Sequence, residues 1–301
     1  MHRPRREFAP YETALARRFR FGPDGVIVGA EPLHLAGEGG RAVLVVHGFG
    51  DTPQSVGELA RALHAEGWTV HVPLLPGHGR SLAAFAASGA AEWRQAVREA
   101  HATLAARHPA VALVGQSMGG ALVVELAAAL GAACPAVVLL APYLAAPRGV
   151  RWGARVAPVL GRILPVLSSD GGPRSIHDPE ARAAALGPGL VTPGLARELV
   201  RVVDGARAAL PHVVAPTLVV QSVRDHRIAP AAATAAFGRL GAATGAEKRL
   251  EWLDGCGHVV AADRERDRVR ALAAAWLAEH VGPRPRSTPH GGAASVSPLP
   301  A

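Results

Sequence analysis

Six short runs of apolar residues constrain the fold of this chain most strongly. They are rich in valine or leucine, show little alternation with polar residues, and cover 42–46, 69–72, 111–114, 136–141, 217–221 and 249–253. Continuous apolar runs of this length are typical of strands buried on both faces. Longer helical patterns separate them, at 55–66, 91–107, 118–130, 230–240 and 263–280. This order predicts an α/β fold with a mostly parallel central sheet and helices on both faces.

One interval is too long for a simple crossover between neighbouring strands. About 75 residues separate the runs that end at 141 and begin at 217. They hold three shorter helical patterns, 151–167, 179–186 and 193–210, divided by turns rich in serine, glycine and proline. We interpret 145–215 as a small helical cap, inserted after the sixth-strand region above the strand ends. The core would then consist of 31–144 and 216–281.

The two ends of the chain lack this pattern. Residues 1–30 are arginine-rich and weakly patterned, which indicates a basic N-terminal extension that behaves as a tail. Residues 282–301 are rich in proline, glycine and serine, and we predict a disordered C-terminal tail.

Composition excludes several classes of protein. A chain of 301 residues that is 49% hydrophobic and 19% charged can bury one large core, so disorder throughout is excluded. The two cysteines, Cys134 and Cys256, form no CxxC pair, which argues against redox, iron–sulfur and disulfide-scaffold proteins. No apolar stretch reaches 18 residues and no apolar segment follows the N-terminus. We therefore expect no integral membrane segment and a cytoplasmic location.

The formal charge of +8 is unevenly distributed. Residues 1–20 carry +4, residues 281–301 carry +2, and the cap carries +4 from nine arginines and five acids, which leaves −2 for the remainder. No nucleic-acid-binding module is recognisable, so we predict no nucleic-acid partner. The arginines of the cap either reflect codon bias or favour anionic acyl compounds or a transient contact with lipid surfaces.

The sharpest motif is Gly-Gln-Ser-Met-Gly-Gly at 115–120. Gly-x-Ser-x-Gly is the nucleophile elbow, a strained turn between a strand and a helix that exposes the serine oxygen above the sheet. With 34 glycines and 11 serines, chance alone gives about 0.14 matches, so the context decides. Here an apolar run precedes the motif and a helical pattern follows it. We therefore predict that Ser117 is a catalytic nucleophile.

A serine nucleophile needs a general base and an acid that orients it, in the chain order serine, acid, histidine. His258 lies in a glycine-bearing loop directly after the last predicted strand. Asp225 follows the run at 217–221, whereas Asp204 falls in a helical stretch of the cap and Asp254 almost adjoins the histidine. We predict His258 as the base and Asp225 as the acid.

An oxyanion hole needs two backbone N–H donors. Met118 follows the nucleophile at a helix N-terminus, where the helix dipole favours negative charge. The loop after the first core run supplies the second donor, which by position is Phe49. His47 in the same loop is predicted to support the loop rather than to act as a second base. The glycines that give these turns room are Gly48, Gly115 and Gly119.

Five motifs together carry a family resemblance: HGFG at 47–50, LPGHG at 75–79, GQSMGG at 115–120, RD at 224–225 and GHVV at 257–260. Over about 31–280 the chain resembles the serine α/β-hydrolase superfamily, and within it bacterial carboxylesterases and monoacylglycerol lipases. The resemblance implies the same triad, Ser117, Asp225 and His258, with the Phe49 and Met118 amides as oxyanion donors. It also implies an α/β-hydrolase fold.

The implied reaction is two-step acyl transfer from a small-molecule ester of short to medium acyl length, monoacylglycerol included: first to Ser117, with release of the alcohol, and then to water. It needs no cofactor. The histidines show no HExxH or other ligand spacing, so we predict no metal site. Because the elbow already supplies a nucleophile, we interpret Cys256 as a small loop residue.

The start of the cap contains apolar residues at helical spacing. They are Leu144, Val150, Trp152, Val156, Val159, Leu160, Ile163 and Leu164. Either they form the buried face of a cap helix, or they line an acyl-chain pocket, for which the candidates are Leu144, Trp152, Val156 and Ile163.

Two other functions stay open from the sequence. The same triad serves thioesterases, amidases or peptidases, and C–C hydrolases. A non-enzymatic binding protein on this scaffold, touching anionic surfaces through its arginine-rich ends, is the alternative from another class.

Overall fold

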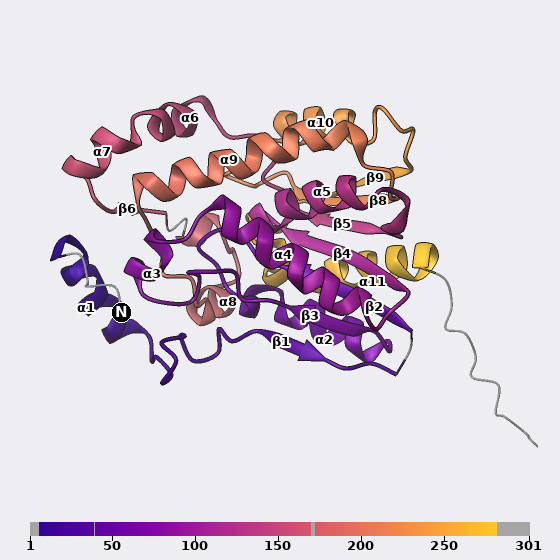
Figure 1. Cartoon of the computed structure of the whole chain (residues 1–301), viewed down its shortest axis with the longest axis horizontal. Coiled ribbons are helices and arrows are strands. Elements are labelled where there is room, and N and C mark those ends of the chain that lie inside the picture. Colours follow the sequence, from indigo (N-terminus) through magenta and orange to yellow (C-terminus); the bar gives the residue numbers. More distant parts are fainter. Residues whose placement is uncertain (1–5, 39, 170–171, 282–301) are drawn as a thin grey trace, which may run out of the picture.

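The computed structural model describes residues 6–38, 40–169 and 172–281 (Figure 1). The tail predicted over 282–301 lies outside these residues.

Seven strands form the large sheet, in the order β1-β3-β2-β4-β5-β8-β9. Their bounds are β1 (Leu33–Leu35), β2 (Arg41–Val46), β3 (Thr69–Val72), β4 (Ala110–Gln116), β5 (Val137–Leu140), β8 (Thr217–Ser222) and β9 (Lys248–Leu253). Only β1 is antiparallel to its neighbour, so the predicted mostly parallel sheet is confirmed. The apolar runs correspond to the six parallel strands. The edge strand β1 has three half-buried or exposed residues and produces no such run.

Alternate residues of the central strands serve two separate cores. Ala42, Leu44 and Val46 of β2 pack on one side of the sheet, and Val43 and Val45 on the other. Helices α4 (Ala90–Ala105) and α5 (Met118–Leu130) cover the first side, and α2 (Gly57–Ala65) and α11 (Arg266–Val281) cover the second (Figure 1). Helices on both faces explain why these strands are continuously apolar.

Further short elements connect these strands and helices or precede them. They are α3 (Leu82–Ala86), α10 (Pro230–Arg239) and the 3₁₀ turns η1 (Arg6–Phe8), η2 (Pro53–Val56), η3 (Gly131–Ala133), η5 (Leu210–His212) and η6 (Val260–Ala262).

The cap lies between β5 and β8. It contains α6 (Arg148–Arg155), α7 (Ala157–Ile163), β6 (Leu167–Ser168), η4 (Gly172–Arg174), α8 (Pro179–Ala184), β7 (Leu190–Val191) and α9 (Pro193–Ala209). The cap therefore follows β5, the fifth strand along the chain, whereas we expected it after the sixth-strand region. The helix predicted over 151–167 is two helices, because Pro158 cannot continue a helix and instead stands in the first turn of α7. Helix α9 packs against α5, α6 and α7 and joins the cap to the core.

Residues 6–30 are folded, which corrects their interpretation as a tail. Helix α1 (Ala9–Arg18) lies at the left edge of Figure 1. Around it Phe8, Leu15 and Phe19 are buried with residues of the following loop and with Leu82 of α3. The Glu12 carboxylate also accepts the Ala83 N–H at 2.9 Å, in the first turn of α3. The sequence pattern is weak because three well-spaced side chains, rather than a continuous stripe, make this contact.

We expect Leu15→Ala to lower the free energy of unfolding by about 2–4 kcal/mol, because it removes a buried side chain and leaves a cavity. Thr13→Ala, at an exposed position of the same helix, should change it by less than about 0.5 kcal/mol. Urea unfolding of both variants measures the difference. Equal midpoints for the two variants would contradict a docked α1.

Candidate active site

Ser117 occupies a strained turn between β4 and α5. Its backbone has φ 55° and ψ −116°, in the left-handed region that residues other than glycine rarely adopt. Two hydrogen bonds hold this conformation: the Ser117 N–H donates to the Leu140 carbonyl at 2.9 Å, and the Ser117 carbonyl accepts the Tyr143 N–H at 3.0 Å. The turn is thus fixed by the neighbouring strand β5 and the loop that follows it.

Glycines make the close packing around the turn possible. A Cβ at Gly119 would collide with the carbonyl oxygen of Val46 at the end of β2. A Cβ at Gly48 would lie only 3.3 Å from the Cβ of Ser117. A Cβ at Gly115, within β4, would likewise collide with the backbone of Gly119 and Gly120 in α5. The elbow and the loop after β2 therefore meet at backbone distance.

The structure brings Ser117, His258 and Asp225 together from the loops after β4, β9 and β8. The Nε2 atom of His258 lies 2.8 Å from the Ser117 Oγ, and its Nδ1 lies 2.7 Å from the Asp225 Oδ2. Both His258 and Asp225 are buried. In this arrangement the carboxylate holds the imidazole so that Nε2 can accept the serine proton.

The Asp225 carboxylate is kept ionised by the hydrogen bonds that surround it. Burial by itself raises the pKa of Asp225, but hydrogen bonding and charge attraction from His258, with further bonds from Arg227 and Gln221, bring the pKa below its usual value. The donors besides His258 are the Arg227 and Ile228 N–H groups, at 2.8 and 3.1 Å, and the Gln221 side-chain amide, at 2.9 Å.

Two residues without a predicted role position the histidine loop. The Gln116 side-chain amide donates to the His258 carbonyl at 3.1 Å. The fully buried Asp263 carboxylate accepts the Gly257 N–H at 2.7 Å and also the N–H groups of His177 and Asp178 in the cap, at 2.9 and 2.8 Å. An aspartate before a helix is a sequence signal for an N-cap. Nothing in the sequence indicates that its partners lie about 85 residues away.

The predicted oxyanion donors lie beside the nucleophile. Met118 is the first residue of α5 and is buried. Phe49 follows Gly48 in the loop after β2, and its ring packs against those of His78, Phe85 and Trp93, with centroids 6.3, 5.3 and 5.9 Å away. Aromatic packing therefore anchors this loop, and the backbone at Gly48 lies close to Ser117.

His47 supports the same loop from behind. Its Nδ1 donates to the Gly48 carbonyl at 2.9 Å, and its Nε2 accepts the Leu75 N–H at 3.1 Å, which defines a neutral ring protonated on Nδ1. Burial lowers the pKa of His47 to about 4, so the ring is uncharged at neutral pH.

A cavity of about 410 Å³ lies above the triad, between the core and the cap. Ser117, His258, Gly48 and Phe49 form its floor. Apolar side chains from the cap include Val150, Ile176, Val191 and Leu199, and charged side chains are Arg18, Asp51, Arg182 and Arg227. This volume and mixture of surfaces are typical of small-molecule sites.

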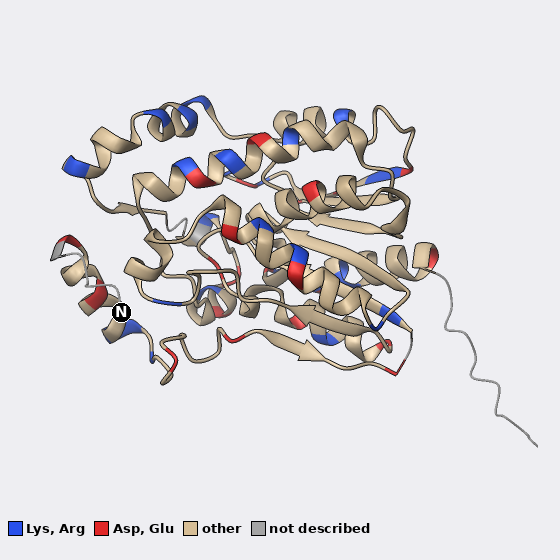
Figure 2. Cartoon of the chain, in the orientation of Figure 1, with Lys and Arg blue, Asp and Glu red and all other residues tan. Residues whose placement is uncertain are grey.

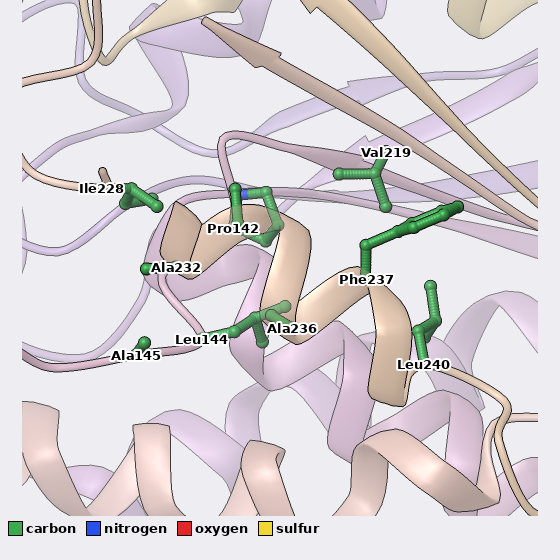
Figure 3. Close-up of a pocket in the computed structure, with 10 residues that line it drawn as sticks. Pro142, Leu144, Ala145, Val219, Ile228, Ala232, Ala236, Phe237 and Leu240 are labelled. Atoms are coloured by element: carbon green, nitrogen blue, oxygen red, sulfur yellow. The ribbon is translucent and has the colours of Figure 1, made fainter. Parts of the chain in front are cut away.

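The predicted pocket residues lie elsewhere. Trp152 and Ile163 are 67% and 73% exposed, Val156 sits at the junction of α6 and α7, and none of the three lines the cavity. Leu144 lines a separate pocket of about 10 Å³, shown in Figure 3 with Pro142 and Ala236 around it. That volume holds about one water molecule. The apolar set recognised by helical spacing is therefore divided: Leu144 is buried and Val150 lines the cavity, whereas Trp152, Val159, Ile163 and Leu164 are exposed.

The environment of Cys256 disfavours a reactive thiolate. The Cys256 thiol is fully buried, which raises its pKa to about 12. A thiol with this pKa carries almost no thiolate at neutral pH. Within the described ranges, no group of three histidine, cysteine or acidic side chains is placed to bind a metal.

A serine elbow above a mostly parallel sheet, with an aspartate and a histidine after later strands, defines a serine α/β-hydrolase. The family model described as serine aminopeptidase, S33 (Hydrolase_4) matches residues 38–265, and the chain belongs to this family. The thermostable monoacylglycerol lipase of Bacillus sp. (strain H-257) is 30% identical over 262 residues, 85% of this chain and 98% of that protein. The carboxylesterase of Bacillus subtilis (strain 168) is 27% identical over 248 residues, 81% of this chain and 94% of that protein.

A solved structure points the same way. It comes from work on LipS and LipT, two metagenome-derived lipolytic enzymes, and superposes with a TM-score of 0.77 at 29% identity. The match covers 85% of this chain and all of that chain, 100%.

No helix in the described part of the chain is both long enough and apolar enough to span a bilayer. The cytoplasmic location expected from the sequence stays a prediction.

The buried neutral His47 should make the fold acid-sensitive. Between pH 6.5 and about 4 the unfolded state binds a proton at this histidine and the folded state does not, so stability falls as the pH falls. From pH 7 to pH 5 this loss is about 2 kcal/mol. His47→Gln should be less stable than the wild type at pH 7 but should lose about 2 kcal/mol less on acidification, measured by urea unfolding at both values. An unchanged acid-induced loss in the variant would contradict this assignment.

Proposed function

We propose that the protein cleaves carboxylic esters of short to medium acyl length, monoacylglycerols included, through an acyl-enzyme on Ser117. The observation that carries this proposal is the continuous hydrogen-bonded series Asp225, His258, Ser117 opening into a cavity of about 410 Å³. The names of the relatives, a monoacylglycerol lipase and a carboxylesterase, support the choice of bond.

Each residue has a defined task in the proposed reaction. His258 Nε2 takes the Ser117 proton while Oγ attacks the ester carbonyl. The Phe49 and Met118 N–H groups stabilise the negative charge on the carbonyl oxygen. The imidazolium, held by Asp225, returns the proton to the departing alcohol, and water then releases the acid by the same steps in reverse order.

The cavity wall suggests where the acyl chain lies. Val150, Val191 and Leu199 of the cap give the cavity an apolar side, suited to a chain of several methylenes. An apolar wall of finite size limits the length of acyl chain that it can cover. We therefore expect activity on p-nitrophenyl esters to rise from C2, reach an optimum at medium length, and fall toward C16.

Ser117→Ala should lower turnover of a medium-chain p-nitrophenyl ester by at least about 10⁴-fold without changing the unfolding midpoint much, because only the nucleophile is lost. Ser168→Ala is the matched control, a serine that lines the same cavity and makes no hydrogen bond to His258. The variants are compared by steady-state kinetics and by labelling with a fluorophosphonate probe. Activity retained by Ser117→Ala would exclude the proposed nucleophile, and a wild-type protein inert to both assays would favour a binding protein.

Amide hydrolysis is the second candidate, favoured by the aminopeptidase in the family's description. The same triad also serves thioester and C–C hydrolysis. Parallel turnover of an ester, a thioester and an amide with one common acyl group ranks these activities. A faster amide than ester would replace the first proposal with this one.

We also propose transient contact with anionic lipid surfaces through the outer face of the cap. Seven large apolar side chains are exposed in the described residues, and four of them, which we call the cap patch, lie in or directly after α6 and α7: Trp152, Val159, Ile163 and Leu164. Residues 148–169 around it contain four arginines and no acid. Figure 2 shows these cations on α6 and at the end of α7. Exposed apolar side chains flanked by arginines are typical of segments that lie in the interface of anionic bilayers.

The double variant Trp152→Ser with Ile163→Ser should bind vesicles containing phosphatidylglycerol at least about tenfold more weakly than the wild type, because it removes the two most exposed apolar anchors. Val214→Ser with Val223→Ser removes exposed apolar residues outside the cap patch and should bind normally. Cosedimentation measures both. Equal binding of the wild type to neutral and anionic vesicles, or equal loss in both double variants, would argue against the cap patch.

A further inference from the structure

The catalytic cavity has a wall that the family match does not include. The match begins at residue 38, whereas α1 ends at Arg18, and Arg18 lines the same cavity as Ser117 and His258. A segment far from the triad in sequence thus contributes a charged side chain to the site.

The packing of α1 fixes where Arg18 lies. The apolar cluster around Leu15 also contacts the partly buried Val166, Leu186 and Leu190 of the cap. In the loop after α1, a Cβ at Gly29 would lie only 3.1 Å from the Leu186 side chain. The N-terminal segment is therefore wedged against both α3 and the cap, at the margin of the cavity. Because Arg18 is the last residue of α1, the docking of this helix places Arg18 at the same margin.

The charges around the cavity are unequal. Three arginines line it, Arg18, Arg182 and Arg227, whereas Asp51 supplies one carboxylate besides that of the triad. This excess of cations points to a positive electrostatic potential inside the cavity. Burial raises the pKa of Asp51, with hydrogen bonds from Ser55 and Thr52 acting in the opposite direction, so this carboxylate is a weaker counter-charge than an exposed one. Arg227 already donates to the Ser169 carbonyl at 2.6 Å.

Arg18 and Arg182 use few of their guanidinium N–H donors in contacts with the described residues. In the described residues neither forms an ion pair: Arg182 donates to the Ile176 carbonyl at 2.9 Å, and the Arg18 guanidinium lies 4.7 Å from the centre of the Phe19 ring. A guanidinium has five N–H donors in a fork that matches carboxylate and phosphate oxygens. Contacts with one carbonyl or one ring leave most of these donors available.

We propose that Arg18 and Arg182 form an anion-binding rim of the cavity and that the enzyme prefers esters carrying a second, negatively charged group, a carboxylate or a phosphate, away from the scissile bond. The proposal rests on the proposed ester hydrolysis and specifies its substrate class. The charged group would remain at the rim while the ester carbonyl reaches Ser117. The N-terminal segment would then be part of the specificity of the site.

The kinetic test compares charged and neutral esters of matched size. One arm uses p-nitrophenyl butyrate and the mono-p-nitrophenyl ester of succinic acid, which places the charge on the acyl side. The other uses 1-octanoylglycerol and its 3-phosphate, which places the charge on the alcohol side. In each arm the readout is the ratio of kcat/KM for the charged ester to that for the neutral ester.

Arg18→Ala and Arg182→Ala should each lower this ratio by about three- to tenfold in at least one arm, and the double variant should lower it further. Arg17→Ala is the matched control, an exposed arginine in the same helical turn that does not line the cavity, and it should leave the ratio unchanged. The arm that responds tells which side of the ester carries the charge. An unchanged ratio in both arms, or an equal fall in Arg17→Ala, would overturn the proposal.

A binding measurement separates this proposal from the proposed activity. Calorimetric titration of the Ser117→Ala protein with octyl phosphate and with octanol needs no turnover. Tighter binding of octyl phosphate that is lost in the additional Arg18→Ala background supports the rim even if no ester is cleaved. Equal affinities for the two compounds would overturn the rim even if ester hydrolysis is established.

Discussion

The left-handed backbone of Ser117 is the constraint on which the rest of the structure depends. Such a conformation costs about 1–3 kcal/mol and persists only where its surroundings fix it. Here β5 and the loop after it supply the two backbone hydrogen bonds that do so. The missing Cβ atoms of Gly48 and Gly119 let β2 and its loop approach the turn. A buried parallel sheet is thus converted into a site where one hydroxyl projects upward between rigid elements.

The cap is built onto the catalytic loops rather than resting above them. The Asp263 carboxylate binds backbone N–H groups of the histidine loop and of the cap at once. Gly257 lacks a Cβ where the carbonyl oxygens of Arg174 and Ser175 pass at close distance, and the Val259 N–H donates to the Ser175 carbonyl. Movement of this part of the cap would therefore disturb His258. The outer helices α6 and α7 lack such ties and carry the exposed apolar residues.

The hydrogen-bonded series Asp225, His258 and Ser117 and the wall of the cavity come from different layers of the protein. The triad and the oxyanion loop belong to the sheet and its nearest loops, which carry the recognisable motifs. The cavity wall belongs to the cap and to α1, whose arginine-rich sequences carry no motif. The excess positive charge of the chain lies in the cap and at the two ends of the chain, and Arg18 and Arg182 bring part of it to the cavity. One fold can thus serve many substrates by changing its outer layer.

The sequence alone determined the six parallel strands of the sheet and indicated the triad. Runs such as 111–114 are apolar at every position because helices cover both faces of the sheet. Ser117, Asp225 and His258 each follow a predicted strand, so the ends of these strands indicate where the three side chains lie. Only the tertiary structure decided what the outer layer does. Periodicity shows that Trp152 and Ile163 share a face but not whether that face is buried, since burial depends on the partner that packs there. Likewise, the apolar contacts of α1 and the hydrogen bonds of Asp263 join residues that are distant in sequence. They can therefore be recognised only in the tertiary structure.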